Sequence, residues 1–194
     1  MTVLIAKAIW VACVIAWYVI RFPYQRRAKK AVVAKSSRGV RESILLTISL
    51  SGLGIVPAIY VFTGVLRFAD YPFVPALAWA GIIPSLFSLW LFYRTHHELG
   101  RYWSVSLEVR DQHRLVTSGI YRHVRHPMYS AFFLWALAQS LLLPNWFAGP
   151  SGFVGFGILF FFRIGREERL MLETFGEEYR AYMERTARIL PGIY

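Results

Sequence analysis

The sequence predicts an all-α, polytopic integral membrane protein with about five transmembrane helices. Hydrophobic residues make up 56% of its 194 residues and charged residues 17%, whereas charged residues alone are about a quarter of an ordinary soluble domain. The mean hydropathy is correspondingly high, at +0.42. The apolar residues also come in long blocks, and about 20 of them suffice to cross a bilayer as a helix. These observations exclude an ordinary soluble domain.

Three of the predicted spans lie in the first half of the chain. Residues 3–20 form the first block, which only Lys7 interrupts, and residues 44–66 and 73–93 carry no charge. The first block lacks a small-x-small cleavage site and ends in aromatic residues and arginines, so we interpret it as a retained helix and not as a signal peptide. The lone cysteine, Cys13, lies within it and is expected to be a packing residue.

A helical hairpin is predicted for the next apolar stretch. Residues 126–162 contain no Asp, Glu, Lys or Arg, and Pro144 and the run 149–152 break them near the middle. The two arms, residues 127–143 and 147–162, are each shorter than the roughly 20 residues of a full span. We therefore expect the hairpin to use polar residues at its ends, to thin the bilayer or to stop short of the far surface.

The distribution of basic residues predicts the topology. Of the 22 Lys and Arg residues, eight lie in residues 21–41, six in 94–125 and six in 163–194. Because basic residues are retained on the cytoplasmic side, these three segments are expected to face the cytoplasm, with the N-terminus outside. The net charge of +11 then reflects topology and attraction to anionic lipid. Membrane lipid is therefore an expected partner and nucleic acid is not.

Two polar segments flank the hairpin, residues 94–129 before it and 163–191 after it, and must therefore be neighbours in space. Arg163 and Glu167 are four residues apart, which puts them on one helical face within ion-pairing reach. Arg163 directly follows three phenylalanines, so its guanidinium should lie at the edge of the hydrocarbon. A charge is unfavourable there unless it has an ion-pair partner or a functional role. A snorkelling arginine with a local salt bridge is the structural alternative.

The tail after the hairpin predicts two helices. Apolar residues at 164, 170, 171, 172 and 175 continue the last span as an amphipathic helix. Gly176 is expected to end this helix, and Pro191 is expected to end a second, short one.

His123 and His126 are three residues apart, a spacing that raises the question of a metal site. Their segment has no cysteine, Pro127 breaks a simple helical geometry, and neighbouring arginines disfavour a cation. We therefore expect no metal ion, and we expect the imidazoles to hydrogen-bond a polar ligand or the backbone. Tyr121 and Tyr129 stay ambiguous, because interfacial tyrosines occur in any membrane protein.

An ordered set of short motifs resembles the isoprenylcysteine carboxyl methyltransferase family. In chain order the motifs are His113–Val116, Ser118–Tyr121, Arg125–Tyr129, Arg163 with Glu167 and Glu168, and Phe175–Tyr179. The resemblance covers about residues 94–194, and the short chain indicates a prokaryotic member. Membrane phospholipid methyltransferases and the C-terminal part of sterol reductases share a looser version of the Arg-His-Pro-x-Tyr signature.

The resemblance implies an enzyme that transfers a methyl group from S-adenosylmethionine to the C-terminal carboxylate of a prenylated cysteine, in a peptide, a protein or a small molecule, and releases S-adenosylhomocysteine. The family's cofactor site falls on His113, Arg114, Leu115, Val116, Tyr121, His126, Pro127, Met128, Tyr129 and Glu167. Arg163 occupies the position associated with the substrate. Residues 1–194 would form one membrane methyltransferase domain, whose cytoplasmic cofactor region comprises residues 94–126 and 163–194.

The chemistry of this reaction is compatible with these residues. A carboxylate is ionised at neutral pH, so methyl transfer needs no general base, and catalysis can come from alignment of the reactants and exclusion of water. We hypothesise that Arg163 hydrogen-bonds the substrate carboxylate, while Glu167 orients Arg163 or the cofactor, which makes these two the expected catalytic residues. The lipid would enter sideways between helices, where Gly152, Gly155 and Gly157 permit close helix approach.

Three other functions stay open on the sequence alone. A phospholipid or other lipid-linked small-molecule methyltransferase would use the same cofactor site, but an amine acceptor has little need for Arg163. A nicotinamide-dependent reductase, as in the sterol family, is the second alternative. A membrane scaffold or transporter is the third, and the absence of charged residues from 44–66, 73–93 and 126–162 disfavours an ion path.

Overall fold

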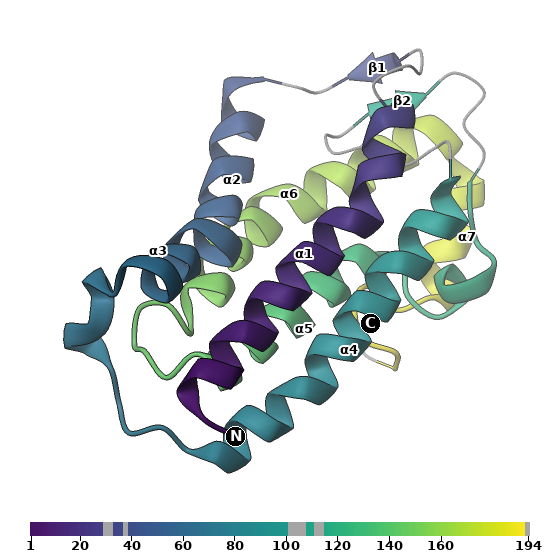
Figure 1. Cartoon of the computed structure of the whole chain (residues 1–194). Coiled ribbons are helices and arrows are strands. Elements are labelled where there is room, and N and C mark those ends of the chain that lie inside the picture. The colour runs from purple at the N-terminus through teal and green to yellow at the C-terminus, as the bar shows by residue number, and fades with distance from the viewer. Residues whose placement is uncertain (29–32, 37–38, 101–107, 111–114, 193–194) are drawn as a thin grey trace.

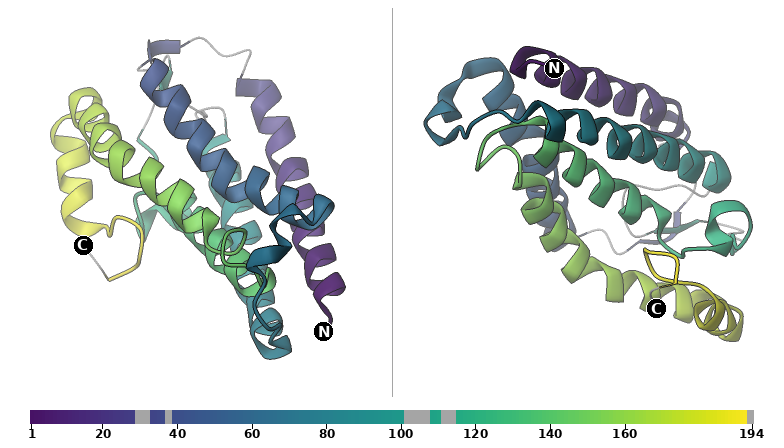
Figure 2. Two further views of the ribbon diagram at one scale, coloured as in Figure 1. Left: turned by 90° about the vertical axis from the view of Figure 1, so that its left-hand side faces the viewer. Right: turned by 90° about the horizontal axis from the view of Figure 1, so that it is seen from below.

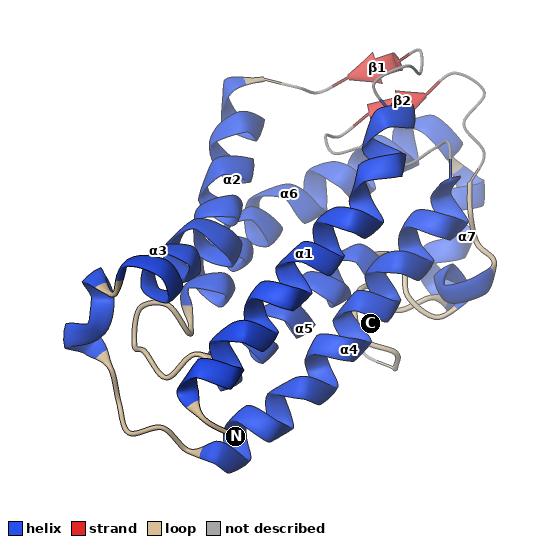
Figure 3. Cartoon of the chain, viewed as in Figure 1, coloured by secondary structure: helices blue, strands red, loops and turns tan. Residues whose placement is uncertain are grey.

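A computed structural model describes residues 1–28, 33–36, 39–100, 108–110 and 115–192. Within these ranges the chain is a bundle of long helices (Figure 1) with one short pair of strands at one end (Figure 3). The prediction of an all-α fold is confirmed, because the strands are a small addition to the helices.

The first helix, α1 (Val3–Ala28), is longer than the predicted span over residues 3–20. Its extension contains Pro23 and ends with Arg26 and Arg27 in the last turn, where basic side chains interact favourably with the helix dipole. The apolar block therefore indicated the membrane part of the helix and not its end.

The second span is one helical rod with a π-helical segment in its middle. It consists of α2 (Val40–Leu50), the π-helix η1 (Ser51–Ile55) and α3 (Val56–Thr63). The carbonyl of Gly52, within η1, accepts hydrogen bonds from the Ser151 hydroxyl at 2.7 Å and the Gln139 amide at 3.2 Å. Side chains of the hairpin thus satisfy backbone groups of the irregular segment, which lipid could not do.

The third span, α4 (Pro75–Leu99), follows the short 3₁₀-helix η2 (Val65–Ala69). Pro75 starts it at a position where a proline costs no hydrogen bond. The helix extends beyond the predicted 73–93, so His96 and His97 belong to its last turn and do not follow it. Among the described elements, α4 packs most extensively against α5 (Pro127–Leu142).

The hairpin consists of α5 and α6 (Ser151–Phe175). The connection between them is organised by the buried Asn145, whose side-chain oxygen accepts hydrogen bonds from the backbone N–H groups of Phe147 and Ala148 at 3.0 and 2.9 Å. Because these groups form a turn, α6 begins at Ser151 and not at residue 147 as predicted.

The tail continues α6 without a break past Arg163, as the amphipathic pattern predicts. Gly176 ends the helix with a φ of 54°, a left-handed conformation that favours glycine. The last helix, α7 (Glu177–Arg185), ends before Pro191, earlier than predicted.

The two strands, β1 (Val33–Ser36) and β2 (Glu108–Arg110), pair in antiparallel fashion. They connect the segment after α1 with the segment after α4, two of the three basic regions of the chain. Figure 1 and the left view of Figure 2 show the strands at the end of the bundle opposite the N-terminus. This placement agrees with the prediction that the two segments share one side.

In the part of the chain that the structure describes, three helical stretches are long and apolar enough to cross a membrane by length and composition: residues 3–27, 40–63 and 75–99. The helix over residues 127–142 is apolar but shorter, and α6 becomes charged from Arg163 onward. The chain is an integral membrane protein with several apolar helices.

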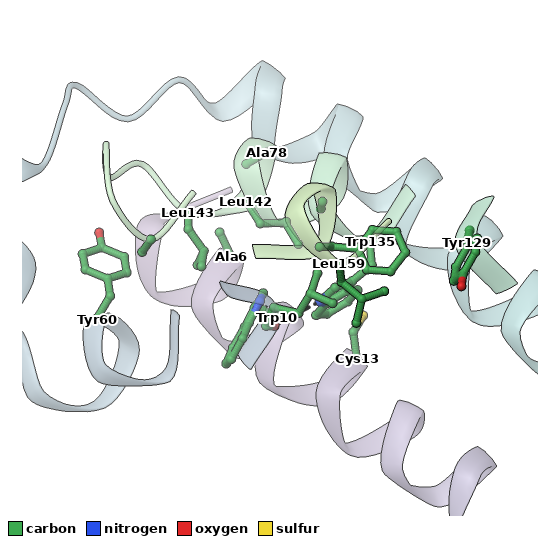
Figure 4. Packing of buried hydrophobic residues seen from close by; sticks show 14 of the residues in the cluster. Ala6, Trp10, Cys13, Tyr60, Ala78, Tyr129, Trp135, Leu142, Leu143 and Leu159 are labelled. Carbon is green, nitrogen blue, oxygen red and sulfur yellow. Dashed lines mark hydrogen bonds between the residues drawn. The ribbon is translucent and has the colours of Figure 1, made fainter. Parts of the chain in front are cut away.

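The core lies between the membrane helices (Figure 4), where Trp10 of α1 faces Trp135 of α5 with ring centroids 6.2 Å apart. Cys13 is buried in the same cluster, as a packing residue would be. Close approach of α2 and α6 depends on Gly155, because a Cβ atom there would lie 2.6 Å from the carbonyl oxygen of Ile48 and 3.0 Å from Gly52 Cα.

We expect Gly155→Ala to destabilise the protein by about 1–3 kcal/mol, because the added methyl group forces α2 and α6 apart. Gly157→Ala on the same helix is the matched control, since a Cβ at this position meets nothing within 4 Å. Thermal unfolding in detergent should therefore show a lower Tm for Gly155→Ala alone. Equal Tm values for the two variants would contradict close packing at Gly155.

Candidate functional site

Almost all of the site residues predicted from the sequence line one cavity of about 760 Å³. Of those residues, it is lined by Leu115, Val116, Tyr121, His126, Pro127, Met128, Tyr129, Arg163 and Glu167. His113 and Arg114 lie outside the described residues. The cavity therefore brings together the segment before the hairpin and the helix after it.

At the polar end of the cavity, the His126 ring lies between the carboxylates of two consecutive glutamates on α6. Its Nδ1 atom is 3.6 Å from Glu167 Oε1, and its Nε2 atom is 3.3 Å from Glu168 Oε1. The Tyr129 hydroxyl donates a hydrogen bond of 2.5 Å to the other oxygen of Glu167. This arrangement suits a protonated imidazole, whose Nε2 atom donates a hydrogen bond to Glu168 and whose charge is paired with Glu167.

Glu168 is buried and pairs with two arginines besides His126. Arg125 Nη2 lies 3.2 Å from Glu168 Oε1, and Arg188 Nη2 lies 2.6 Å from Glu168 Oε2. The guanidinium of Arg125 also donates hydrogen bonds to the carbonyls of Met183 and Thr186. These contacts hold the C-terminal tail against the start of α5.

Backbone hydrogen bonds strengthen the same junction. The N–H groups of Arg125 and His126 donate to the carbonyls of Ala187 and Arg188 at 2.8 and 3.0 Å. The Ser130 hydroxyl donates to the carbonyl of Ile189 at 2.5 Å. The tail after α7 therefore fixes the position of His126 in the cavity wall.

Arg163 lies between two carboxylates from different helices. Its Nη1 atom is 3.3 Å from Glu42 Oε1 on α2, and its Nε atom is 3.6 Å from Glu167 Oε2 on α6. Arg163 and Glu42 are both buried, with exposures of 8% and 1%. The predicted pairing of Arg163 with Glu167 is present, and Glu42 is a partner that the sequence did not indicate.

Tyr121 reaches the cavity from a short 3₁₀-helix, η4 (Gly119–Arg122). Glu98, at the end of α4, accepts a hydrogen bond of 2.8 Å from the N–H of Ile120. A Cβ atom at Gly119, where φ is 60°, would collide with the Glu98 carboxylate. This glycine therefore allows α4 to hold the turn that carries Tyr121.

Helix α7 adds Tyr179 and Tyr182 to the cavity wall, next to Leu170 and Met171 of α6. The Tyr182 hydroxyl donates a 2.5 Å hydrogen bond to the carbonyl of Tyr121. Burial raises the pKa of Tyr121, Tyr179 and Tyr182, which keeps these phenols neutral. Together they form an aromatic, largely apolar part of the wall.

The opposite end of the cavity is apolar and lies among the membrane helices. Its walls there include Val14, Trp17, Leu50, Leu53, Trp135 and Phe156. An apolar groove formed by α1, the end of α2, η1 and α3 shares Val14, Leu50 and Gly54 with this cavity. The cavity thus joins a charged region to a hydrocarbon-like region within a single space.

The charges at the polar end shift the pKa values of its titratable groups. Burial alone would raise the pKa of Glu167 and Glu168, but hydrogen bonds with His126 and nearby positive charges lower both to about 2. Burial would lower the pKa of His126, but hydrogen bonds and charges from the two glutamates raise it above its usual 6.5. Both shifts favour the fully ionised cluster.

These shifts predict a maximum of stability in mildly acidic solution. The two glutamates contribute stability above their usual pKa of 4.5, which is lost as the pH falls toward about 2. His126 contributes stability below 6.5, which is lost as the pH rises through its raised pKa. We therefore expect Tm in detergent to fall on both sides of this window, and His126→Gln to flatten the alkaline side. An unchanged alkaline decline in His126→Gln would contradict the assignment.

His123 does not share the position of His126. It is exposed, and its Nε2 atom accepts a hydrogen bond of 2.8 Å from Arg122. Within the described part of the chain, no group of three or more His, Cys, Asp or Glu residues is arranged to hold a metal ion.

Comparison with known proteins identifies part of the chain. The family model for the isoprenylcysteine carboxyl methyltransferase (ICMT) family matches residues 79–173. Over these residues, just under half of the chain, the protein is similar to this family. The match includes Tyr121, His126, Arg163 and Glu167 of the cavity wall, and it ends before α7.

Curated relatives named protein-S-isoprenylcysteine O-methyltransferase match stretches of similar length. The protein-S-isoprenylcysteine O-methyltransferase of Dictyostelium discoideum is 37% identical over 94 residues, which cover 46% of this chain and 38% of that protein. The enzyme from Homo sapiens is 38% identical over 89 residues, covering 46% and 31%. The probable enzyme from Oryza sativa subsp. japonica is 38% identical over 93 residues, covering 46% and 47%. The chain therefore matches less than half the length of each of these relatives.

Several wall and supporting residues were not among the predicted site residues. Arg125 and Glu168 lie within the ICMT-like motifs, so their position next to His126 and Glu167 was an available signal. Tyr179 lies at the end of the last motif, but a single tyrosine in a polar tail gives no sign of burial. Glu42 follows a basic stretch outside the ICMT match, and nothing local distinguishes it from a solvated residue.

Proposed function

We propose that this protein transfers a methyl group from S-adenosylmethionine to the C-terminal carboxylate of a prenylated cysteine. The observation that carries the proposal is the continuity of the cavity, which runs from Arg163 and Glu167 to an apolar end among the membrane helices. A prenylated cysteine has two parts that match these two ends: a carboxylate, which can bind Arg163, and a long hydrocarbon chain, which suits the apolar end. The names of the ICMT relatives support this reading.

The residues of the polar end fit S-adenosylmethionine. This molecule carries a sulfonium cation, a zwitterionic amino-acid head and an adenosine. Glu167 offers an ionised carboxylate to positive charge, and the aromatic wall of Tyr121, Tyr179 and Tyr182 suits a planar base. A cavity of about 760 Å³ lies within the usual range of ligand sites, about 300–1,000 Å³.

In this proposal His113–Val116, Tyr121, His126–Tyr129 and Glu167 hold the cofactor. When bound, the cofactor supplies an electrophilic methyl group. His126, fixed by the tail and by Glu168, keeps Glu167 ionised and in place. Glu167 in turn orients the Arg163 guanidinium from its own helix.

Arg163 binds the acceptor carboxylate in this scheme. A buried guanidinium donates several hydrogen bonds in a fixed plane, which suits the two oxygens of a carboxylate. Because the carboxylate is already ionised, no residue has to remove a proton. The apolar walls exclude water, so that alignment of the reactants provides most of the acceleration.

The proposed orientation places the polar end of the cavity in the cytoplasm. Arg21, Tyr121 and Arg163, one from each of the three basic segments, line the cavity, and basic segments are retained on the cytoplasmic side. The cofactor would enter from the water, and the prenyl chain would occupy the apolar end from the surrounding lipid.

Methyl incorporation from labelled S-adenosylmethionine tests this function in purified protein reconstituted in lipid. The expected result is labelling of a prenylcysteine analogue with a free carboxylate and none of its methyl ester. Phosphatidylethanolamine is the second acceptor to be compared. Labelling of this lipid in place of the prenylcysteine analogue would favour the phospholipid methyltransferase alternative and overturn the proposal.

A further inference from the structure

We propose that Glu42 is a positioning residue that fixes the Arg163 guanidinium for the acceptor carboxylate. The inference rests on the proposed function and extends it to α2, which lies outside the segment that matches the ICMT family. It assigns to the N-terminal half of the chain a part in building the acceptor site.

The contact itself is buried and close. Glu42 Oε1 lies 3.3 Å from Arg163 Nη1, and Glu42 is 1% exposed. Among the described residues its carboxylate has no hydrogen-bond partner, and there the positive charge of Arg163 balances its negative charge. A buried carboxylate is unfavourable without a partner, which ties the position of Glu42 to that of the guanidinium.

The backbone around Glu42 is held rigidly against α6. Glu42 lies in the first turn of α2, where the helix dipole favours a negative charge. Further along the same rod, Gly52 and Gly155 bring the two helices into backbone contact, and Gln139 and Ser151 bind the carbonyl of Gly52. Glu42 therefore reaches Arg163 from a fixed helix and not from a loop.

Two carboxylates on different helices define the orientation of the guanidinium. Glu167 contacts Nε from α6, where Tyr129 also holds it, and Glu42 contacts Nη1 from α2. Contacts at two different nitrogen atoms and from two helices restrict rotation of the guanidinium more than the contact with Glu167 does by itself. With both, the plane of the guanidinium is set, as binding of a carboxylate by two parallel hydrogen bonds requires.

Glu42 acts through Arg163 and not on the reactants directly. Arg163, Glu167 and Tyr129 line the cavity, whereas Glu42 is not among its lining residues. Its loss should therefore affect use of the acceptor and leave the cofactor side of the cavity, around His126 and Tyr121, unchanged.

The test compares Glu42→Gln with wild type in lipid, with Glu42→Asp as the variant that keeps the charge. We expect kcat/KM for a prenylcysteine analogue to fall about 10- to 100-fold in Glu42→Gln, because misplacement of a binding group by about 1 Å has effects of this size. Affinity for S-adenosylhomocysteine, measured by calorimetry, should stay within about two-fold. Glu42→Asp should recover part of the loss. Glu178→Gln, the same change at an exposed site on α7, should resemble wild type.

The possible outcomes separate this inference from the proposed function. A wild-type protein that methylates the analogue, together with an unimpaired Glu42→Gln, would overturn the inference alone. Equal losses of acceptor use and of S-adenosylhomocysteine affinity, or loss of the fold in both variants, would assign Glu42 a structural role and also overturn it. A wild-type protein that binds S-adenosylhomocysteine but leaves the analogue unmethylated would refute the proposed function itself.

Discussion

Replacement of Arg163 by lysine is expected to lower kcat/KM for a prenylcysteine acceptor by about 100-fold or more. An ammonium group keeps the charge but loses the planar set of donors, so it cannot contact Glu42, Glu167 and an acceptor carboxylate in the same geometry. The variant should still bind S-adenosylhomocysteine, because in the proposed function residues other than Arg163 hold the cofactor. Steady-state kinetics in lipid, combined with calorimetric titration, measures both quantities.

Arg169→Lys is the matched control for this experiment, because Arg169 is an exposed arginine on the same helix. It should retain wild-type kinetics. Near-normal turnover of folded Arg163→Lys would remove Arg163 from the mechanism. An equal loss of cofactor affinity would instead give Arg163 a general role in the stability of the site.

Replacement of Glu168 by alanine is expected to destabilise the protein by about 3–5 kcal/mol, the usual cost of removing one partner from a buried ion pair. Arg125 and His126 would keep their charges in a buried environment without this partner, and Arg188 of the tail would lose its contact with α6. Chemical or thermal unfolding in detergent measures the change.

Glu178→Ala, on the exposed face of α7, controls for the loss of a glutamate as such and should change stability little. Because the tail fixes His126 in the cavity wall, Glu168→Ala should also weaken binding of S-adenosylhomocysteine. A variant with wild-type stability would show that the backbone hydrogen bonds of Ala187 and Arg188 hold the tail without Glu168.

Comparison of the predicted spans with the observed helices shows which features of a helix its hydropathy pattern predicts. The predicted arm over residues 127–143 and the observed α5, Pro127–Leu142, differ by one residue, because Pro127 and Pro144 mark its ends within the sequence. The helices α1 and α4 extend beyond their apolar blocks, because charged residues such as Arg26 and Glu98 continue the helix. Hydropathy identifies the membrane part of a helix and not its full length.

No hydropathy pattern in the sequence predicted the π-helix η1. Its residues, Ser51–Ile55, carry no charge, as is true of the whole apolar block over residues 44–66. What stabilises the irregular backbone is the set of hydrogen bonds to Gly52 and Leu53 from Trp135, Gln139 and Ser151. Those partners are distant in sequence, so a local pattern cannot predict the segment.

The sequence by itself determined the membrane class, the approximate positions of the spans and the neighbourhood of Arg163 and Glu167, because hydropathy and helical spacing are local properties of the chain. The tertiary structure decided that Glu42 pairs with Arg163 and that the C-terminal tail surrounds His126. Both arrangements depend on which helix faces join, α2 against α6 and the tail against the start of α5. Burial and ion pairing between distant residues arise only when such faces pack together, and so they have no counterpart in local sequence.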